Sequence, residues 1–168
     1  MTQTLVAIHQ PNFLPWLGYF NKIARADVFV ILDSVQFAKT GGTWSNRVQM
    51  LVGGQAIWIT MPIVRSYHGL RTYREMEIGE DTPWRTKLLK TIQLNYAAAS
   101  YFEAIFPTVQ TIMSNRTRSL ADFNEAAVST LCAGLRLDSG KLVRSSTLPV
   151  SGQATDLLIA IVHSVGGT

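Results

Sequence analysis

A chain of 168 residues with 47% hydrophobic and 15% charged residues is too apolar and too weakly charged to be disordered. Its length is that of one ordinary domain, which can bury a hydrophobic core without disulfides or a metal ion. The formal net charge is +4, but the basic residues are scattered and mixed with acids. Nucleic acid is therefore not expected as the main ligand. The positive net charge would equally well attract an anionic small molecule.

The N-terminal part predicts a strand, a helix and a second strand. Residues 5–8 form a short continuous apolar run, typical of a buried strand, and lead into the polar segment 9–12. Pro15 suits the first turn of a helix, and the apolar residues of 16–24 recur at helical spacing. Residues 28–32 are a second apolar run. This order predicts parallel pairing of the two strands with a right-handed crossover.

The middle of the chain is less regular. Residues 37–46 are expected to form a loop, and the pair Gly41-Gly42 inside it suggests a mobile segment that closes on a substrate. Segments 47–52 and 56–61 flank two further glycines and predict a β-hairpin, although 47–51 is also compatible with a helix.

The C-terminal half predicts mainly helices. Thr82-Pro83 is a favourable helix start, residues 101–113 are apolar and helical in pattern, and Ser119 suits an N-cap. A strand is expected at 142–146. The last predicted helix, 154–165, is apolar on most sides and is expected to be buried.

These elements predict a single α/β domain over residues 1–168, with three layers, a mainly parallel sheet and an inserted antiparallel hairpin. No N-terminal targeting segment is visible, and the longest apolar stretch, 157–162, is too short to cross a bilayer. Cys132 lies in an apolar helical pattern and is expected to be a buried, reduced thiol. The sequence therefore predicts a cytoplasmic protein without membrane insertion.

Two titratable residues follow the predicted parallel strands. Ligands of open α/β sheets bind at the carboxyl ends of strands, which is where His9 and Asp33 stand. His9 could act as acid or base, and Asp33 could orient it, hold a cation or accept a sugar hydroxyl. The alternative is that both only satisfy backbone groups of their own loops. No metal-ligand spacing appears among the three histidines, so no metal site is predicted.

Side chains suited to binding a substrate lie in the same segments. Trp16 could stack on a sugar or a base, or belong to the core, and Gly18 permits close helix packing or close approach of a ligand. Lys22 and Arg47 could each bind a phosphate or carboxylate, or be ordinary surface cations. The candidate substrate-binding residues are Gln10, Pro11, Trp16, Gly18, Lys22, Gln36, Lys39, Trp44, Asn46 and Arg47.

Three stretches carry a resemblance to a known family. Residues 9–22 contain His-Gln-Pro followed by Pro-Trp-x-Gly and a Lys; residues 33–39 are followed by Trp-Ser-Asn-Arg at 44–47; and residues 59–63 form a strand that ends in a proline. In these stretches the chain resembles the WbqC-like family of bacterial proteins. The resemblance implies an enzyme of surface-polysaccharide (O-antigen, lipopolysaccharide) biosynthesis. It also suggests transfer of an acyl or aminoacyl group, such as glycine, to an amino sugar or nucleotide sugar.

The chain departs from that family in two places. Val48 stands where members commonly have an Asn, and members usually continue past the helix expected at 154–165. The sequence is therefore expected to lack the family's C-terminal segment.

Two alternatives to the transferase remain open. The His-x-Pro loop between strand and helix, with a Ser-rich stretch at 144–147, also resembles the HUP-type nucleotidyltransferases. That resemblance implies ATP with magnesium as cofactor and an adenylating reaction. A truncated, inactive binding protein is the other alternative. The expected partner is a small molecule, namely a sugar, nucleotide sugar or amino acid, and an oligomer is compatible with the sequence.

Overall fold

The computed structural model describes residues 3–40 and 43–168 and has a mixed α/β fold. Three strands, β1 (Val6–His9), β2 (Val28–Ile31) and β5 (Leu142–Arg144), form a parallel sheet in the order β1-β2-β5. His9 pairs with Ile31, so the two predicted strand ends lie side by side. The parallel strand pair and the helix between its strands are confirmed. The Gly41-Gly42 pair, predicted to be mobile, lies outside the described residues.

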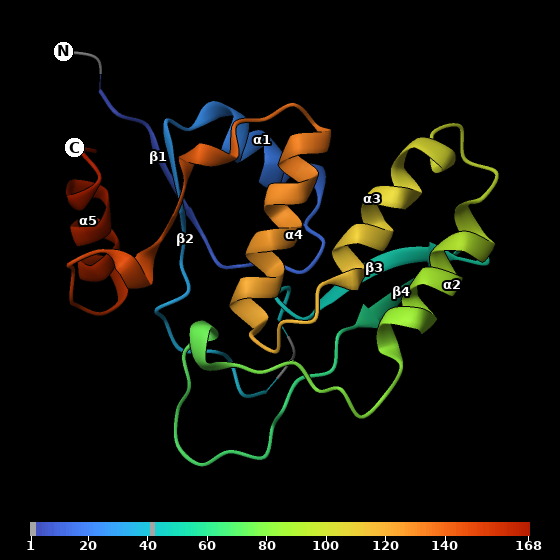
Figure 1. Cartoon of the computed structure of the whole chain (residues 1–168). Coiled ribbons are helices and arrows are strands. Elements are labelled where there is room, and N and C mark those ends of the chain that lie inside the picture. Colours follow the sequence, from blue (N-terminus) through green and yellow to red (C-terminus); the bar gives the residue numbers. More distant parts are fainter. Residues whose placement is uncertain (1–2, 41–42) are drawn as a thin grey trace.

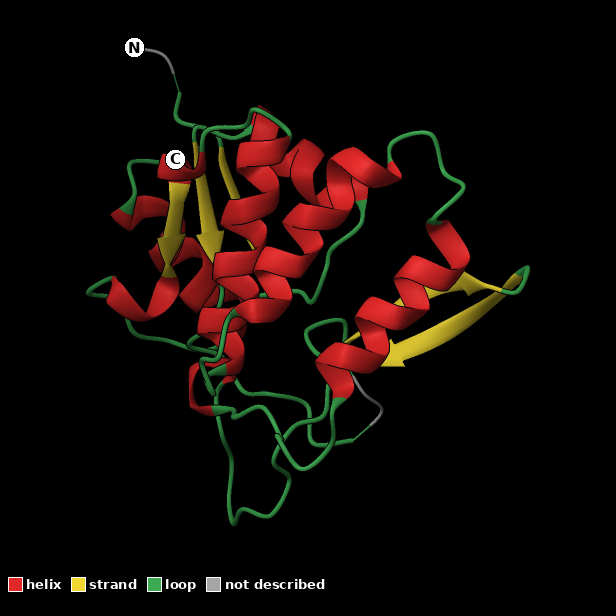
Figure 2. Ribbon diagram, turned by 45° about the vertical axis from the view of Figure 1, so that its right-hand side comes forward, coloured by secondary structure: helices red, strands yellow, loops and turns green. Residues whose placement is uncertain are grey.

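Helices cover both faces of this sheet (Figures 1 and 2). Helices α1 (Leu17–Arg25) and α4 (Leu120–Gly134) pack against Phe29 and Ile31, whereas α5 (Ala154–Ser164) packs against Val30. Successive side chains of a strand point to opposite faces, so the continuous apolar run of β2 serves both layers. Cys132 of α4 is free and buried in this core, as predicted, and burial raises its pKa.

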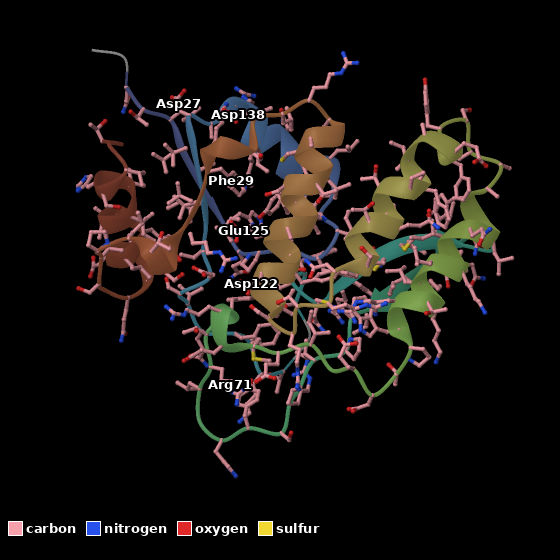
Figure 3. The ribbon with its side chains drawn as sticks, viewed as in Figure 1. Asp27, Phe29, Arg71, Asp122, Glu125 and Asp138 are labelled. Atoms are coloured by element: carbon pink, nitrogen blue, oxygen red, sulfur yellow. The ribbon has the colours of Figure 1, made fainter. Side chains whose placement is uncertain are left out.

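Charged side chains fasten α4 to the end of β5. Arg144 pairs with Asp122 at 2.6 Å and also with Glu125, and both acids project from α4 in Figure 3. These bonds fix the helix relative to the carboxyl end of the sheet, where the strand ends carry the candidate site.

The second part of the molecule contains the hairpin and two helices. Strands β3 (Arg47–Val52) and β4 (Gln55–Thr60) are antiparallel, which confirms the hairpin and excludes the helical alternative. The tyrosine hydroxyl of Tyr96 accepts the N–H of Leu51 and so ties the hairpin to α2 (Trp84–Tyr96), which packs beside α3 (Phe102–Ser114). This group lies beside the sheet-based part in Figure 2.

Short 3-10 turns complete the fold at Tyr73–Glu75, Ser139–Lys141 and Ser145–Thr147. The last of these replaces the final two residues of the strand that was predicted at 142–146. Within the described part of the chain, no helix is both long and apolar enough to span a bilayer.

The prediction that the last helix is buried was wrong. Only Leu157 and Ile161 of α5 are buried, while Leu158 and Ile159 are exposed. One stripe of a helix is enough to pack on a three-stranded sheet, so apolar composition around the whole helix did not imply burial.

Candidate functional site

Three exposed tryptophans from three separate segments stand side by side. The ring centroids of Trp16 and Trp44 are 5.4 Å apart, and those of Trp44 and Trp58 are 5.2 Å apart. Their exposed fractions are 46%, 47% and 42%. Indole rings normally bury much of their surface, so a contiguous row of half-exposed rings is a candidate binding surface. We call these three residues the tryptophan strip.

His9 lies at one end of the tryptophan strip. Its ring centroid is 5.9 Å from that of Trp16 and 4.9 Å from that of Tyr19, which is fully buried. A pocket of about 250 Å³ opens beside it, lined by Ile8, His9, Gln10, Leu32 and Leu158. The imidazole is thus packed on one side and reaches a hollow on the other.

The hydrogen bonding of His9 defines its neutral tautomer. Nδ1 lies 3.1 Å from the carbonyl oxygen of Gln10. A carbonyl can only accept, so Nδ1 carries the proton and Nε2 keeps its lone pair. Partial burial lowers the pKa of His9 below its ordinary value of 6.5; the bond to Gln10 opposes this shift, and the charge of Lys22 adds to it. The ring is therefore neutral at pH 7 and suited to accept a proton.

Arg47 lies at the other end of the strip. Its guanidinium carbon is 4.2 Å from the ring centroid of Trp58, a cation–π contact. A groove of about 310 Å³ between β4 and α2 begins at the same indole and is lined in part by Thr60, Thr82 and Lys87. The strip thus connects a base at one end with a cation and a groove at the other.

A network of backbone contacts holds the loops that carry the strip. The side-chain amide nitrogen Nδ2 of Asn124 on α4 donates to the backbone carbonyls of Pro11 and Ser45, at 3.0 and 2.7 Å. The N–H of Phe13 donates to the carbonyl of Trp44. Asn46 is buried and donates to the carbonyl of Met61 at the end of the hairpin. Pro11 and Asn46 were both predicted to bind substrate. Their hydrogen bonds instead help to hold the loops that carry the tryptophan strip.

Gly18 explains how Trp16 reaches its position. A Cβ atom at Gly18 would lie 2.8 Å from the indole nitrogen of Trp16, closer than such atoms approach. Helix α1 begins at Leu17, one residue after Trp16, so the indole folds back over the first turn. The missing side chain makes room for a tryptophan of the strip rather than for a neighbouring helix.

Asp33 does not meet His9 in the structure. Its carboxylate accepts hydrogen bonds from the hydroxyls of Ser145 and Ser146 and from the N–H of Ser146, at 2.7–3.0 Å. The residue is fully buried. The predicted orientation of His9 by Asp33 is thus not found in the described chain, because the carboxylate turns toward β5 while His9 stands on β1.

The same contacts involve the Ser-rich stretch at 144–147, which is part of the resemblance to the HUP-type nucleotidyltransferases. The hydroxyls of Ser145 and Ser146 both donate to Asp33, and Ser145 also accepts the N–H groups of Asp33 and Ser34. A carboxylate already occupies this turn and would repel a phosphate. The turn is a structural clasp between two strands.

Two further candidates, Lys39 and Gln36, contact other loop residues. The ammonium group of Lys39 lies 5.1 Å from the ring centroid of Tyr67, and its carbonyl accepts from Arg65. Gln36 is exposed and pairs with Thr72 in an isolated antiparallel bridge. Lys22 and the exposed Gln10 stay near His9, with which Lys22 interacts electrostatically. The site thus gathers some predicted residues and leaves others in loop packing.

Trp58 is the residue that sequence reasoning missed. It stands in the predicted strand 56–61, where an aromatic residue normally packs against its neighbours. The local pattern held no signal that singled it out, since Ile57 on the opposite face of β4 is exposed as well.

Comparisons with known proteins agree with the resemblance noted from the sequence. The model of the WbqC-like protein family matches residues 10–168. The uncharacterized protein Rv1507c of Mycobacterium tuberculosis is 29% identical over 164 residues, which cover 97% of this chain and 69% of that protein. No solved structure matches.

Proposed function

This chain belongs to the WbqC-like protein family, and on that premise we propose that it is a transferase of surface-polysaccharide biosynthesis. The substrate is a sugar or nucleotide sugar with an amine, and the transferred group is acyl or aminoacyl. The observation that carries the proposal is the continuous row from His9 across the tryptophan strip to Arg47.

The tryptophan strip suits a flat, partly apolar and partly hydroxylated ligand. A sugar ring presents C–H groups on its faces and hydroxyls at its rim, so it can stack on an indole while remaining hydrated. The three indoles, whose neighbouring ring centroids are 5.4 and 5.2 Å apart, form a surface for a ligand longer than one ring. Arg47 at the end of the row is placed to pair with a phosphate of a nucleotide sugar.

His9 supplies the proton transfer that such a reaction needs. The acceptor amine attacks the acyl carbon of the donor, a C–N bond forms, and the bond from that carbon to the donor's leaving group breaks. Nε2 of His9 takes the proton lost by the nitrogen and passes it to the leaving group. The neutral tautomer and lowered pKa of His9 support this role at pH 7. Asp33 takes no part, because its oxygens are bonded to the serine turn.

The first test is a thermal-shift screen with nucleotide sugars, amino acids and ATP with magnesium, followed by turnover assays on each ligand that stabilises the protein. We expect an amino-sugar nucleotide to raise the melting temperature. With that ligand, His9→Ala should lower kcat by a factor of about 10² to 10⁴ with little change in KM. Stabilisation by ATP with magnesium alone would instead favour the adenylating alternative.

Matched variants separate the strip from the general surface. Trp44→Ala should weaken binding, whereas Tyr101→Ala removes a more exposed aromatic ring outside the strip and should not. His68→Ala, in an exposed loop, is the control for His9. Turnover unchanged in His9→Ala would overturn the proposal, as would equal effects of Trp44→Ala and Tyr101→Ala.

A further inference from the structure

The backbone carbonyl of Gln10 is shared by two side chains of the site. Nδ1 of His9 lies 3.1 Å from its oxygen, and the hydroxyl of Tyr19 donates to the same oxygen at 3.3 Å. A carbonyl oxygen has two lone pairs, so it can accept both hydrogen bonds at once. His9 belongs to β1 and Tyr19 to α1, so one backbone atom links a strand end to the helix that follows it.

Tyr19 is held firmly enough to fix the position of that carbonyl. The residue is fully buried, and its ring centroid lies 5.1 Å from that of Phe29 and 4.9 Å from that of His9. Close packing on two sides leaves the ring little freedom to move. Burial also raises the pKa of the Tyr19 hydroxyl well above its ordinary value of 10.0. The hydroxyl therefore keeps its proton at neutral pH and acts as a donor toward Gln10.

The position of the Gln10 carbonyl decides which nitrogen of His9 carries the proton. In a neutral imidazole the protonated nitrogen is the one that has an acceptor, and the other keeps its lone pair. Gln10 is an exposed loop residue. Without the bond from Tyr19 its carbonyl would be free to turn toward water, and Nδ1 would lose the acceptor that keeps its proton there.

We propose that Tyr19 is a positioning residue: its hydroxyl holds the carbonyl of Gln10, and this carbonyl holds His9 in the tautomer whose Nε2 is free to accept a proton. The role expected for Asp33 is thus filled by a tyrosine and a backbone carbonyl. Because it is fully buried, Tyr19 acts through His9 and not on the substrate. The consequence for turnover rests on the proposed function, whereas the tautomer can be measured in the free protein.

The test is Tyr19→Phe, which removes the hydroxyl and keeps the ring. Long-range ¹H–¹⁵N spectra of protein with ¹⁵N-labelled histidine, recorded above the pKa of His9, distinguish protonated from unprotonated ring nitrogens. His9→Gln identifies the His9 signals among the three histidines. We expect the Nδ1–H tautomer in the wild type and a shift toward Nε2–H in Tyr19→Phe. Tyr73→Phe is the control, since Tyr73 is buried in a different hydrophobic cluster, and it should leave the His9 tautomer unchanged.

The wild-type spectrum is a test that needs no variant, because a His9 found in the Nε2–H tautomer would overturn the inference. A folded Tyr19→Phe that keeps the wild-type tautomer would also overturn it, as would equal shifts in Tyr19→Phe and Tyr73→Phe. Circular dichroism of each variant establishes that it is folded.

Turnover separates this inference from the proposed function. On a ligand that the wild type converts, Tyr19→Phe should lower kcat about tenfold with little change in KM, because a smaller fraction of His9 presents a free Nε2. A tautomer shift without turnover of any sugar would sustain the positioning of His9 and contradict the transferase. Turnover that depends on His9 and not on Tyr19 would do the reverse.

Discussion

His9 and Asp33 follow neighbouring parallel strands, but their side chains have different surroundings. His9 stands on β1 with a packed ring face and a hollow beside it. Asp33 follows β2, which lies in the middle of the sheet, and its carboxylate turns to the other neighbour, β5. In a three-stranded sheet the central strand has two neighbours, and its terminal side chain can bond with either. The position of a residue at a strand end thus indicates a functional site without identifying its partner.

The lowered pKa of His9 predicts a pH dependence of stability. Burial makes the folded state hold the proton less tightly than the unfolded chain, so the unfolded state is protonated first as the pH falls below about 6.5. The free energy of unfolding should therefore decrease as the pH falls from 6.5 toward the lowered pKa of the folded state. His9→Gln should flatten this part of the curve, measured by urea unfolding at several pH values.

The same substitution at the exposed His68 serves as the control for loss of an imidazole. A wild-type slope retained in His9→Gln would show that other groups cause the pH dependence, and that the imidazole is not held neutral by its surroundings.

At the scale of elements, the serine turn after β5 closes the carboxyl end of the sheet. Ser145 donates to Asp33 and accepts two N–H groups from the segment after β2, so one hydroxyl joins two strands that are distant in sequence. The turn begins directly after β5 ends at Arg144. The clasp also keeps β2 and β5 in register at their carboxyl ends.

We predict that Asp33→Asn destabilises the protein by about 2–3 kcal/mol, because an amide offers one acceptor oxygen where three donors converge. The measurement is the free energy of urea unfolding. Asp27→Asn is the matched control, since Asp27 is exposed and accepts one backbone N–H, that of Leu5. Its expected cost is below about 1 kcal/mol. Equal costs for the two variants would contradict the structural role of the clasp.

Periodicity in the sequence identified most of the helices and strands, but it did not identify which side chains are exposed or which distant residues they contact. The apolar runs of β1 and β2 and the Gly-Gly hairpin were predictable, since strand patterns and turn residues act locally. The exposure of side chains was not predictable. Trp16 and Trp58 are half-exposed, and α5 is buried along one stripe only. The burial of a side chain depends on which distant segment packs over it, and the partner of Asp33 lies more than a hundred positions away.

At the scale of the whole molecule, Asn124 joins the two parts. Its single amide nitrogen bonds to the carbonyl of Pro11, in the loop after β1, and to that of Ser45, just before the hairpin. Asn124 belongs to helix α4, whose residues Val128 and Cys132 pack against the sheet. Phe123 of the same helix packs in the hydrophobic core of the second part. The loops that carry Trp16 and Trp44 are thus both bonded to one residue of a third segment.

Asn124→Ala is therefore predicted to affect both stability and the strip. Two buried carbonyls lose their donor, which should lower the free energy of urea unfolding by about 2–4 kcal/mol. Because the loops that carry Trp16 and Trp44 lose a common anchor, ligand affinity at the strip should fall even where the protein remains folded. Asn21→Ala, at an exposed position of α1, is the control and should change neither quantity. If Asn124→Ala lowered stability but left the tryptophan fluorescence and the ligand affinity unchanged, the strip would be held by the hairpin and α1 alone. The joint position of its rings would then depend on local packing rather than on the way the two parts of the molecule meet.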